Sequence, residues 1–183
     1  MEIFSERLVL TCLGPESVEL VADYVVRNWT YVAPFMPLAD ADFFTVAAQR
    51  EKLRHEAELR QQDRAIRFYL FHHDDLARRW ILGDINLSNI VRGAFQSCFL
   101  GYKMALAATG KGYMTEAVAR AAHFAFHDLH LHRIEANIMP RNVPSRRVVE
   151  KLGFVEEGLA RKYLKINGIW EDHLHYVLLN PDG

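Results

Sequence analysis

The sequence has few cysteines, no excess of basic residues and no long hydrophobic run. Its two cysteines, Cys12 and Cys98, lie in separate apolar stretches, which excludes a disulfide framework and favours a reducing compartment. The net charge of −1 argues against a general nucleic-acid-binding protein, because such proteins need a strongly basic surface. No stretch approaches the ~18 apolar residues that cross a membrane, and the first residues lack the apolar core of a signal peptide. We therefore expect a soluble cytoplasmic protein that does not bind membranes.

Length and composition are those of an ordinary globular chain. Half of its 183 residues are hydrophobic and a quarter are charged. No internal repeat or low-complexity segment divides the chain, so we predict a single domain over residues 1–183. Alternating and helical patterns predict strands over residues 7–13, 68–71, 80–87, 98–104, 133–139, 154–159 and 163–166 and from residue 170, and helices over residues 14–26, 45–61, 113–129 and 146–152.

Residues 28–37 form an aromatic and apolar segment with two prolines. Because proline interrupts regular backbone hydrogen bonding, we predict an irregular loop here. Such a loop either covers the core or lines a site for an apolar ligand, and the sequence does not separate the two.

A glycine-containing loop joins the strand over residues 98–104 to the helix that begins at Tyr113. Gly110 and Gly112 let a ligand approach the backbone closely, and the helix start adds unpaired N–H groups and the positive end of a dipole. This arrangement favours binding of a phosphate or pyrophosphate. Two glycines also fit an ordinary strand-to-helix turn, and the loop lacks the further residues of a dinucleotide fingerprint or a P-loop.

Histidines on the long helix offer a weaker alternative. His123 and His127 lie one turn apart and could bind zinc together with Asp128. Since no Glu follows His123, we favour solvated side chains and predict no metal site.

A rarer pattern follows about thirty residues later: Asn142-x-x-Ser145, then Leu152-Gly153-Phe154. Together with the Gly-x-Gly helix start, it resembles the GCN5-related N-acetyltransferase (GNAT) superfamily. The likeness is closest to ribosomal-protein N-terminal acetyltransferases of the RimJ/RimL type, and to the RimJ branch of these. It covers essentially the whole chain, including the stretches over residues 29–37, 86–93, 101–102, 110–117, 132–134, 139–142 and 164–173.

The resemblance implies an α/β fold with a mixed, twisted central sheet of about seven strands and helices on both faces. It also implies a V-shaped opening between the strands that end at Met104 and Met139. The activity implied is acetyl transfer from acetyl-coenzyme A (acetyl-CoA) to the N-terminal amine of a protein, most simply a ribosomal protein that begins with Ala or Ser. The alternatives are a small-molecule amine as acceptor, or a non-catalytic module that binds the ribosome. A monomer and a homodimer fit equally well.

In such enzymes the loop N–H groups bind the pyrophosphate, and a backbone N–H at Met104 or Ala105 faces the thioester oxygen, where it stabilises the oxyanion. By the same resemblance, Asn142 contacts the pantetheine arm and Ser145 lies near the departing sulfur. The cofactor-binding residues that the resemblance implies are Met104, Ala105, Thr109, Gly110, Lys111, Gly112, Tyr113, Met114, Asn142 and Arg147.

The chain departs from the family at the proton-transfer positions. Phe99 stands where many relatives have a general-base glutamate, and Val149 where many have a general-acid tyrosine. The pKa of an α-amine is about 7.7–8.0, so a fraction of the amine is already neutral at cellular pH. A strong general base is therefore less necessary. The catalytic residues predicted are therefore Ser145 with Asp84 and Asn86, the latter two acting through a water; Glu135 is a third candidate.

The acceptor is expected opposite the coenzyme. Asp84, Asn86 and Ser88 alternate along one strand and so share a face, which is either an acceptor site or an ordinary solvated face. Aromatic side chains can hold an extended peptide, while polar ones bind its backbone. The substrate-binding residues predicted are Tyr31, Phe35, Ser88, Trp170 and Asp172.

Overall fold

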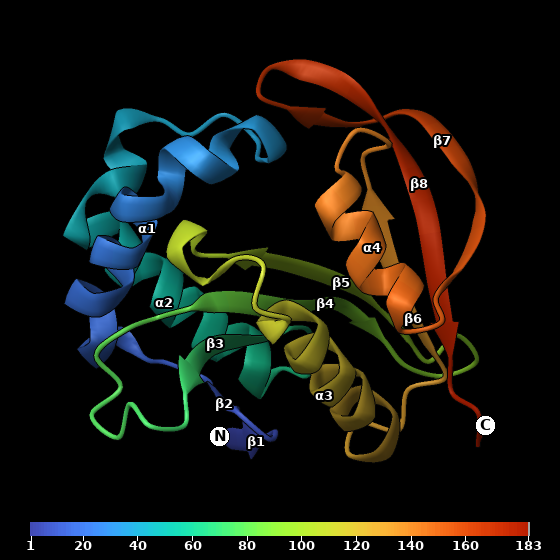
Figure 1. Cartoon of the computed structure of the whole chain (residues 1–183), viewed down its shortest axis with the longest axis horizontal. Helices are drawn as coiled ribbons and strands as arrows, with labels where there is room; N and C mark the ends of the chain where they lie inside the picture. Colours follow the sequence, from blue (N-terminus) through green and yellow to red (C-terminus); the bar gives the residue numbers. More distant parts are fainter. Residues whose placement is uncertain (183) are drawn as a thin grey trace.

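Eight strands form one mixed sheet in the computed structural model, which describes residues 1–182 (Figure 1). Their order across the sheet is β1-β2-β3-β4-β5-β6-β8-β7, and every neighbouring pair is antiparallel except β5 and β6. The strands are β1 (Glu2–Phe4), β2 (Leu8–Thr11), β3 (Ile66–His72), β4 (Gly83–Val91), β5 (Ser97–Met104), β6 (Arg133–Ile138), β7 (Val155–Ile166) and β8 (Ile169–Leu179). The predicted fold is confirmed, with one additional strand at the N-terminus.

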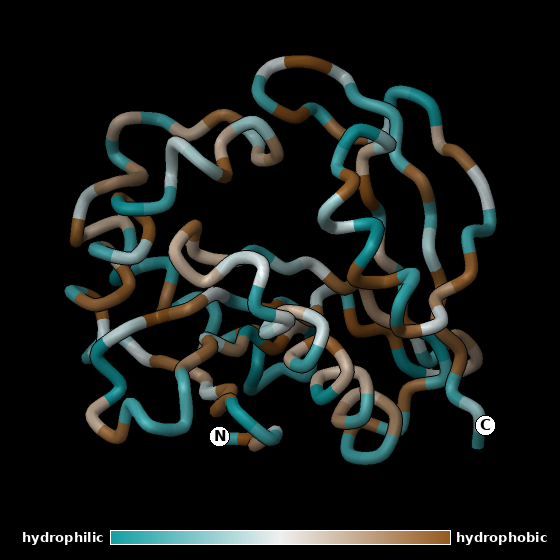
Figure 2. The backbone as a smooth tube through the Cα atoms, in the orientation of Figure 1, coloured by the Kyte–Doolittle hydropathy of each residue, from teal (hydrophilic) through white to brown (hydrophobic). Residues whose placement is uncertain are grey.

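Two pairs of helices cover the sheet. α1 (Val18–Val32) and α2 (Val46–Gln61) pack on one face, whereas α3 (Tyr113–His127) and α4 (Val143–Lys151) pack on the other. Side chains of β3 alternate between the two layers: Phe68 joins the core under α3, and Tyr69 the core under α1 and α2. In Figure 2 the connection between β3 and β4, at the lower left, is mainly hydrophilic, as expected for an exposed loop.

The segment over residues 28–37 is more regular than predicted. α1 continues to Val32, and a 3₁₀ helix, Ala33–Phe35, follows directly. Pro34 lies in the first turn of this 3₁₀ helix, where a backbone N–H has no intrahelical partner to lose. The expectation of an irregular loop was therefore wrong, because proline ends one helix here and opens the next.

The two strand predictions at residues 154–159 and 163–166 describe one long strand, β7. Its pairing with β8 shifts register between Ala160 and Leu164, and Lys162 there has a positive φ of 48°. This bulge interrupts the alternation that the sequence pattern relies on. Asn167 and Gly168 form the turn that joins β7 to β8, as is usual for this dipeptide in a hairpin.

The central strands separate as the family resemblance implied. β5 and β6 pair only where Ser97–Phe99 lie beside Arg133–Glu135. Beyond this point β5 runs on to Met104 and β6 to Ile138 without pairing to each other. No helix in residues 1–182 is long and apolar enough to cross a membrane.

Candidate active site

A cleft of about 610 Å³ lies where β5 and β6 separate. Its walls come from both halves of the sheet, the loop before α3, the first turns of α4 and the end of α1. Among the residues predicted for the site, the lining contains Tyr31, Phe35, Asp84, Asn86, Met104, Thr109, Gly110, Gly112, Tyr113, Met114, Asn142, Ser145 and Arg147. Ser88, Ala105, Lys111, Trp170 and Asp172 do not line it.

The loop before α3 presents an uninterrupted row of backbone donors. Gly110 and Gly112 have φ values of 74° and 79°, a conformation that suits glycine. The first helical hydrogen bond runs from the Glu116 N–H to the Gly112 carbonyl (3.1 Å), and no side chain caps the helix start. The six N–H groups from Gly110 to Thr115 therefore find no partner among residues 1–182. Such a row at a helix N-terminus is suited to a pyrophosphate.

Glu116 fixes this loop to the N-terminal strands. Its carboxylate accepts from the Arg7 N–H and Nε (each 2.7 Å) and from Ser5 Oγ (2.7 Å). Arg7 Nη1 also donates to the carbonyl of Lys111 (3.1 Å). Burial would raise the pKa of Glu116, but the bonds from Ser5 and Arg7 outweigh it and lower the pKa. Glu116 thus does more than complement the helix dipole: it holds the loop in place.

The backbone at the end of β5 favours one of the two predicted oxyanion donors. The Ala105 N–H donates to the Leu82 carbonyl (2.8 Å), so the expectation of a free N–H at Ala105 was wrong. Neighbouring residues of an extended strand direct their N–H groups to opposite edges. The Met104 N–H therefore points to the side on which β6 has diverged.

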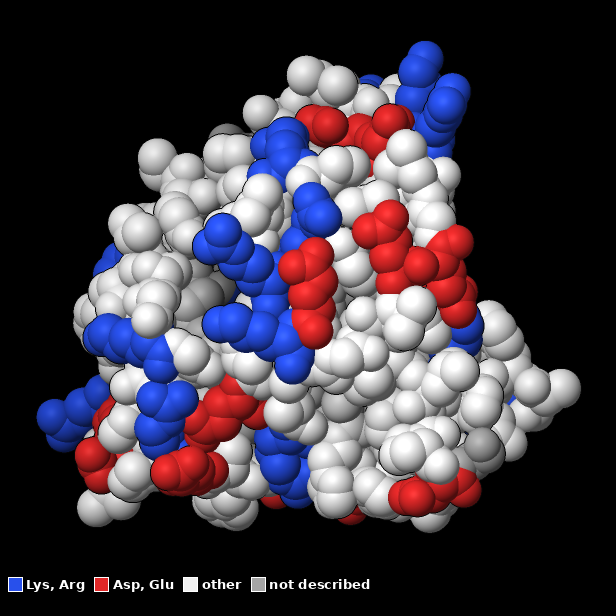
Figure 3. All heavy atoms as spheres, turned by 45° about the vertical axis from the view of Figure 1, so that its right-hand side comes forward, with Lys and Arg blue, Asp and Glu red and all other residues white. Residues whose placement is uncertain are grey.

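α4 supplies the wall of the cleft opposite the loop before α3. Asn142 is its N-cap, with Oδ1 accepting from the Ser145 N–H (3.4 Å), so Ser145 itself is not the cap. The Tyr102 hydroxyl of β5 donates to the Ser145 carbonyl (2.6 Å) and fixes this end of α4 against the sheet. Arg147 and Lys151 line the cleft one turn apart, and neither forms an ion pair within the described chain. Figure 3 shows a band of Lys and Arg side chains in the region of α4, beside a hollow.

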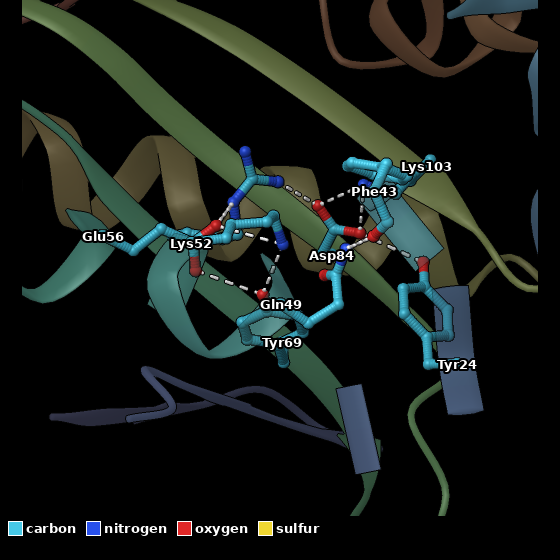
Figure 4. Close-up of polar contacts among 9 residues, drawn as sticks. Tyr24, Phe43, Gln49, Lys52, Glu56, Tyr69, Asp84 and Lys103 are labelled. Carbon is cyan, nitrogen blue, oxygen red and sulfur yellow. Dashed lines mark hydrogen bonds and ion pairs between the residues drawn. The ribbon is translucent and has the colours of Figure 1, made fainter. Parts of the chain in front are cut away.

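A buried ionic cluster forms the floor of the cleft on its α1 side (Figure 4). Asp84 is 1% exposed and accepts from Lys103 Nζ (2.8 Å), from the Tyr24 hydroxyl (3.0 Å) and from Arg67. Burial would raise the pKa of Asp84, but the charges of Lys103, Arg67 and Lys52 hold it well below its usual value. A carboxylate held so strongly in its charged form is a poor proton acceptor, so these surroundings favour Asp84 as an anchor.

The cluster continues onto α2. Arg67 Nε lies 2.7 Å from Glu56 Oε1, and Lys52 Nζ lies 3.2 Å from the same oxygen. Lys52 also donates to the Tyr69 hydroxyl (3.0 Å), which in turn donates to Glu56 Oε2 (3.1 Å). Each buried charge therefore faces an opposite one, as burial in a low dielectric demands.

The end of α1 and the β7–β8 hairpin meet over the cleft. Arg141 Nη2 donates to the Pro34 carbonyl (2.9 Å) and lies 2.8 Å from Glu171 Oε1. The Asn167 N–H at the hairpin tip donates to the Met36 carbonyl (2.9 Å). Figure 1 shows the hairpin reaching across to this segment. These hydrogen bonds and the ion pair hold the segment that carries Phe35 against the hairpin, so the two together cover this end of the cleft.

Two predicted substrate residues of the hairpin lie elsewhere. Trp170 is 57% exposed and lies outside the cleft lining. Asp172 accepts from the Lys162 N–H (2.8 Å), so it stabilises the bulge of β7. The sequence alone could not show this, because the bulge changes which side chains of the hairpin face the cleft.

The cleft residues that were missed include Lys103, Asn137 and His173. His173 is only 3% exposed, with Nδ1 3.0 Å from the Glu171 carbonyl. Asn137 Oδ1 is buried and has no hydrogen-bond partner within the described residues. Both alternate with apolar residues along β8 and β6, but that pattern does not tell which polar face lines a cleft.

Histidines cluster at two places in the described chain. The ring centroids of His123 and His127 lie 4.1 Å apart, and among residues 1–182 only His72, His73 and Asp74 gather three potential ligand atoms. These three lie at an exposed turn.

Comparison with known proteins agrees with this geometry. The family described as Acetyltransferase (GNAT) domain matches residues 7–155. The probable N-acetyltransferase YjcK of Bacillus subtilis is 44% identical over 156 residues, covering 85% of this chain and 84% of its own. The [ribosomal protein uS5]-alanine N-acetyltransferase of Escherichia coli is 35% identical, covering 100% of this chain and 92% of its own.

Solved structures show the same fold. The ribosomal-protein-S5-alanine acetyltransferase of Vibrio fischeri superposes with a TM-score of 0.92 at 34% identity, covering 100% of this chain and 98% of its own. RimJ of Mycobacterium smegmatis, in complex with CoA-disulfide, has a TM-score of 0.88 at 26% identity, covering 96% and 83%. The domain match over most of the chain and the full-length relative lead to one conclusion: this protein is a member of the GNAT acetyltransferase family.

Proposed function

We propose that this enzyme transfers the acetyl group of acetyl-CoA to the N-terminal α-amine of a protein, and that the acceptor is a ribosomal protein. The observation that carries the proposal is a single cleft with two chemically different ends. One end offers the unpaired N–H row of residues 110–115, and the other is walled by aromatic and polar side chains. The acceptor class is supported by the relatives, two of which act on the alanine of ribosomal protein S5.

The chain's own groups fit acetyl-CoA. The N–H row suits the pyrophosphate, and Arg147 and Lys151 supply positive charge along α4. The Met104 N–H is available to the thioester oxygen, where it would stabilise the oxyanion that forms on attack. Ser145, in the first turn of α4, can donate its hydroxyl proton to the departing sulfur.

The acceptor enters from the other end. Tyr31 and Phe35 line this part of the cleft, and Asn86 offers polar atoms to a peptide backbone. Because the segment over residues 33–36 and the β7–β8 hairpin close over it, a narrow extended chain end suits the entrance better than a folded surface. We expect peptides that begin with Ala or Ser to react best, since a bulky first side chain would collide near the thioester.

The test uses matched synthetic peptides and mass spectrometry. One peptide begins with Ala and has a free N-terminus; the other has the same sequence with a blocked N-terminus and an internal lysine. We expect acetylation of the first peptide only. Acetylation of lysine alone, or of polyamines and no peptide, contradicts the N-terminal assignment and favours a small-molecule acceptor. Coenzyme binding without any transfer favours the non-catalytic alternative.

A further inference from the structure

The imidazole of His173 is held in one orientation with one nitrogen free. Its Nδ1 lies 3.0 Å from the Glu171 carbonyl oxygen. Since a carbonyl can only accept, Nδ1 must carry the hydrogen, and Nε2 then has a free lone pair. Nε2 finds no partner among residues 1–182, although the side chain is 97% buried and lines the cleft. Nε2 is therefore an acceptor without a protein donor on a residue that lines the cleft, and it can accept a hydrogen bond from a ligand bound there.

Asn137 also lines the cleft and carries a second unsatisfied acceptor. Its Oδ1 is buried without a partner. Asn137 lies directly opposite His175 in the β6–β8 ladder, so His173 is its diagonal neighbour on the same face of the sheet. Two acceptors on diagonal neighbours of one sheet face, neither with a protein donor, suit a group that has two N–H bonds to donate. A primary amine is such a group.

His175 does not fit this role. Its Nε2 is also buried without a partner, but its Nδ1 lies 3.1 Å from Glu135 Oε1 and the residue does not line the cleft. A substrate amine in the cleft therefore meets His173 and not His175. This difference between two histidines on one strand provides a matched control.

We propose that the amine to be acetylated is bound between the Asn137 amide oxygen and Nε2 of His173, and that His173 accepts its proton. The inference rests on the proposed function and names the general base that the family position at Phe99 does not supply. The neutral amine attacks the thioester carbonyl, a C–N bond forms, and one amine proton moves to Nε2. The C–S bond then breaks, coenzyme A leaves as its thiolate and takes a proton from Ser145, which is reprotonated by solvent. His173 returns its proton to solvent.

The surroundings of His173 favour its neutral form, which is the form that can accept a proton. Burial lowers its pKa from the usual value of about 6.5, against opposing contributions from Glu171 and Asp172. His175 on the same strand lowers the pKa further, and Tyr163 of β7 packs against the ring, with centroids 5.6 Å apart. Glu135 of β6 contacts His175, with its Oε1 3.1 Å from His175 Nδ1. His173 is therefore neutral at pH 7.

The test compares His173→Asn with His175→Asn. An asparagine amide can keep the hydrogen bond to the Glu171 carbonyl while removing the titrating Nε2. At pH 7 we expect His173→Asn to lower kcat/KM by about 100-fold, within the usual contribution of a general base. The wild-type log kcat/KM should fall with slope 2 at acid pH, because both the amine and His173 must lose a proton. The slope should become 1 in His173→Asn and remain 2 in His175→Asn.

Further measurements separate the possible failures. Calorimetry with coenzyme A reports whether each variant is folded, and His173→Gln replaces His173→Asn if the latter is not. Asn137→Ala should raise the acceptor KM roughly three- to tenfold and keep slope 2. Retention of slope 2 in a folded His173 variant, or its loss in His175→Asn, overturns this inference alone. If the wild type acetylates a small amine instead of peptides, the proposed function fails and the same series is run on that amine. If it acetylates no amine, both fail.

Discussion

Asp84 of β4 and Lys103 of β5 face each other across the antiparallel ladder, and their side chains form an ion pair of 2.8 Å in the floor of the cleft. Asp84 is almost completely buried, and Arg67 contacts it from the neighbouring strand β3. Strand register therefore brings two cations onto one carboxylate. This places charge at the boundary between the sheet and α1, where Tyr24 adds a hydrogen bond.

We predict that Asp84→Asn destabilises the protein by about 3–5 kcal/mol, because it leaves buried cations without their counter-charge. Tyr24→Phe is the control: it removes one hydrogen bond and should cost about 1 kcal/mol. Urea unfolding at pH 7 measures both. Equal losses in the two variants would contradict an essential role for the carboxylate charge.

The same pair predicts an acid dependence of stability. The pKa of Asp84 is lower in the folded protein than the ~3.9 of an unfolded chain, so the native state binds fewer protons. Its contribution is complete above pH ~4 and is lost as the pH falls toward the folded pKa. Unfolding free energies between pH 7 and pH 3 should fall less steeply in Asp84→Asn than in the wild type.

At the loop before α3, we predict that Gly112→Asp weakens coenzyme A binding tenfold or more. The new carboxylate would lie beside the unpaired N–H row, and loss of one charge-assisted contact is worth ~1.5–3 kcal/mol. Gly93→Asp is the matched control, since Gly93 also has a positive φ (72°) and open space around it. Calorimetry should give a wild-type Kd for the control; a wild-type Kd in folded Gly112→Asp excludes the loop as the binding site.

On α4, Ser145→Ala should lower kcat with little change in acetyl-CoA affinity or in Tm. Asn142, not Ser145, caps the helix, so Asn142→Ala should lose about 1 kcal/mol and about 2–4 °C in Tm. Turnover and Tm measured on the same preparations separate a role in the reaction from a role in helix stability. Unchanged turnover in Ser145→Ala would remove its hydroxyl from the reaction.

How far the sequence could predict the site depends on how local each feature is. Gly110 and Gly112 act through the local backbone, so their spacing was enough to predict the loop before α3. The start of α4 was predicted three residues too late, at residue 146, because Asn142 caps the helix and Pro144 lies within its first turn. The end of α1 was missed for a related reason. A proline excludes a helix interior, but the rule does not say that the chain resumes a helix at that same proline.

Features that depend on register between distant strands were out of reach. The free side of Met104 follows from the Ala105 bond to Leu82, and the orientation of His173 from the pairing of β6 with β8. Asp172 was predicted to bind substrate, but it accepts a hydrogen bond from the bulge at Lys162. The sequence could not show this, because a bulge has no sequence signature. Composition identified a polar cleft, but only the fold decides which polar side chains enter it.

Arg141 links the segment over residues 33–36 to the β7–β8 hairpin above the cleft, so it should affect binding of the acceptor and not of acetyl-CoA. Arg141→Met removes the hydrogen bond to Pro34 and the ion pair with Glu171 while keeping an apolar stem near Phe35. Because the ion pair is exposed, Tm should change little. The peptide KM should rise roughly three- to tenfold, because residues 33–36 lose their link to the hairpin, while the KM for acetyl-CoA stays the same.

Arg92→Met is the control. Arg92 also forms an ion pair with an acid, Asp63 (2.5 Å), and donates to a carbonyl, that of Leu129, but it does not line the cleft. The difference between the two variants should shrink at high salt, where the wild-type ion pair is itself weakened. An equal peptide KM in Arg141→Met and Arg92→Met would show that acceptors do not pass beneath the hairpin.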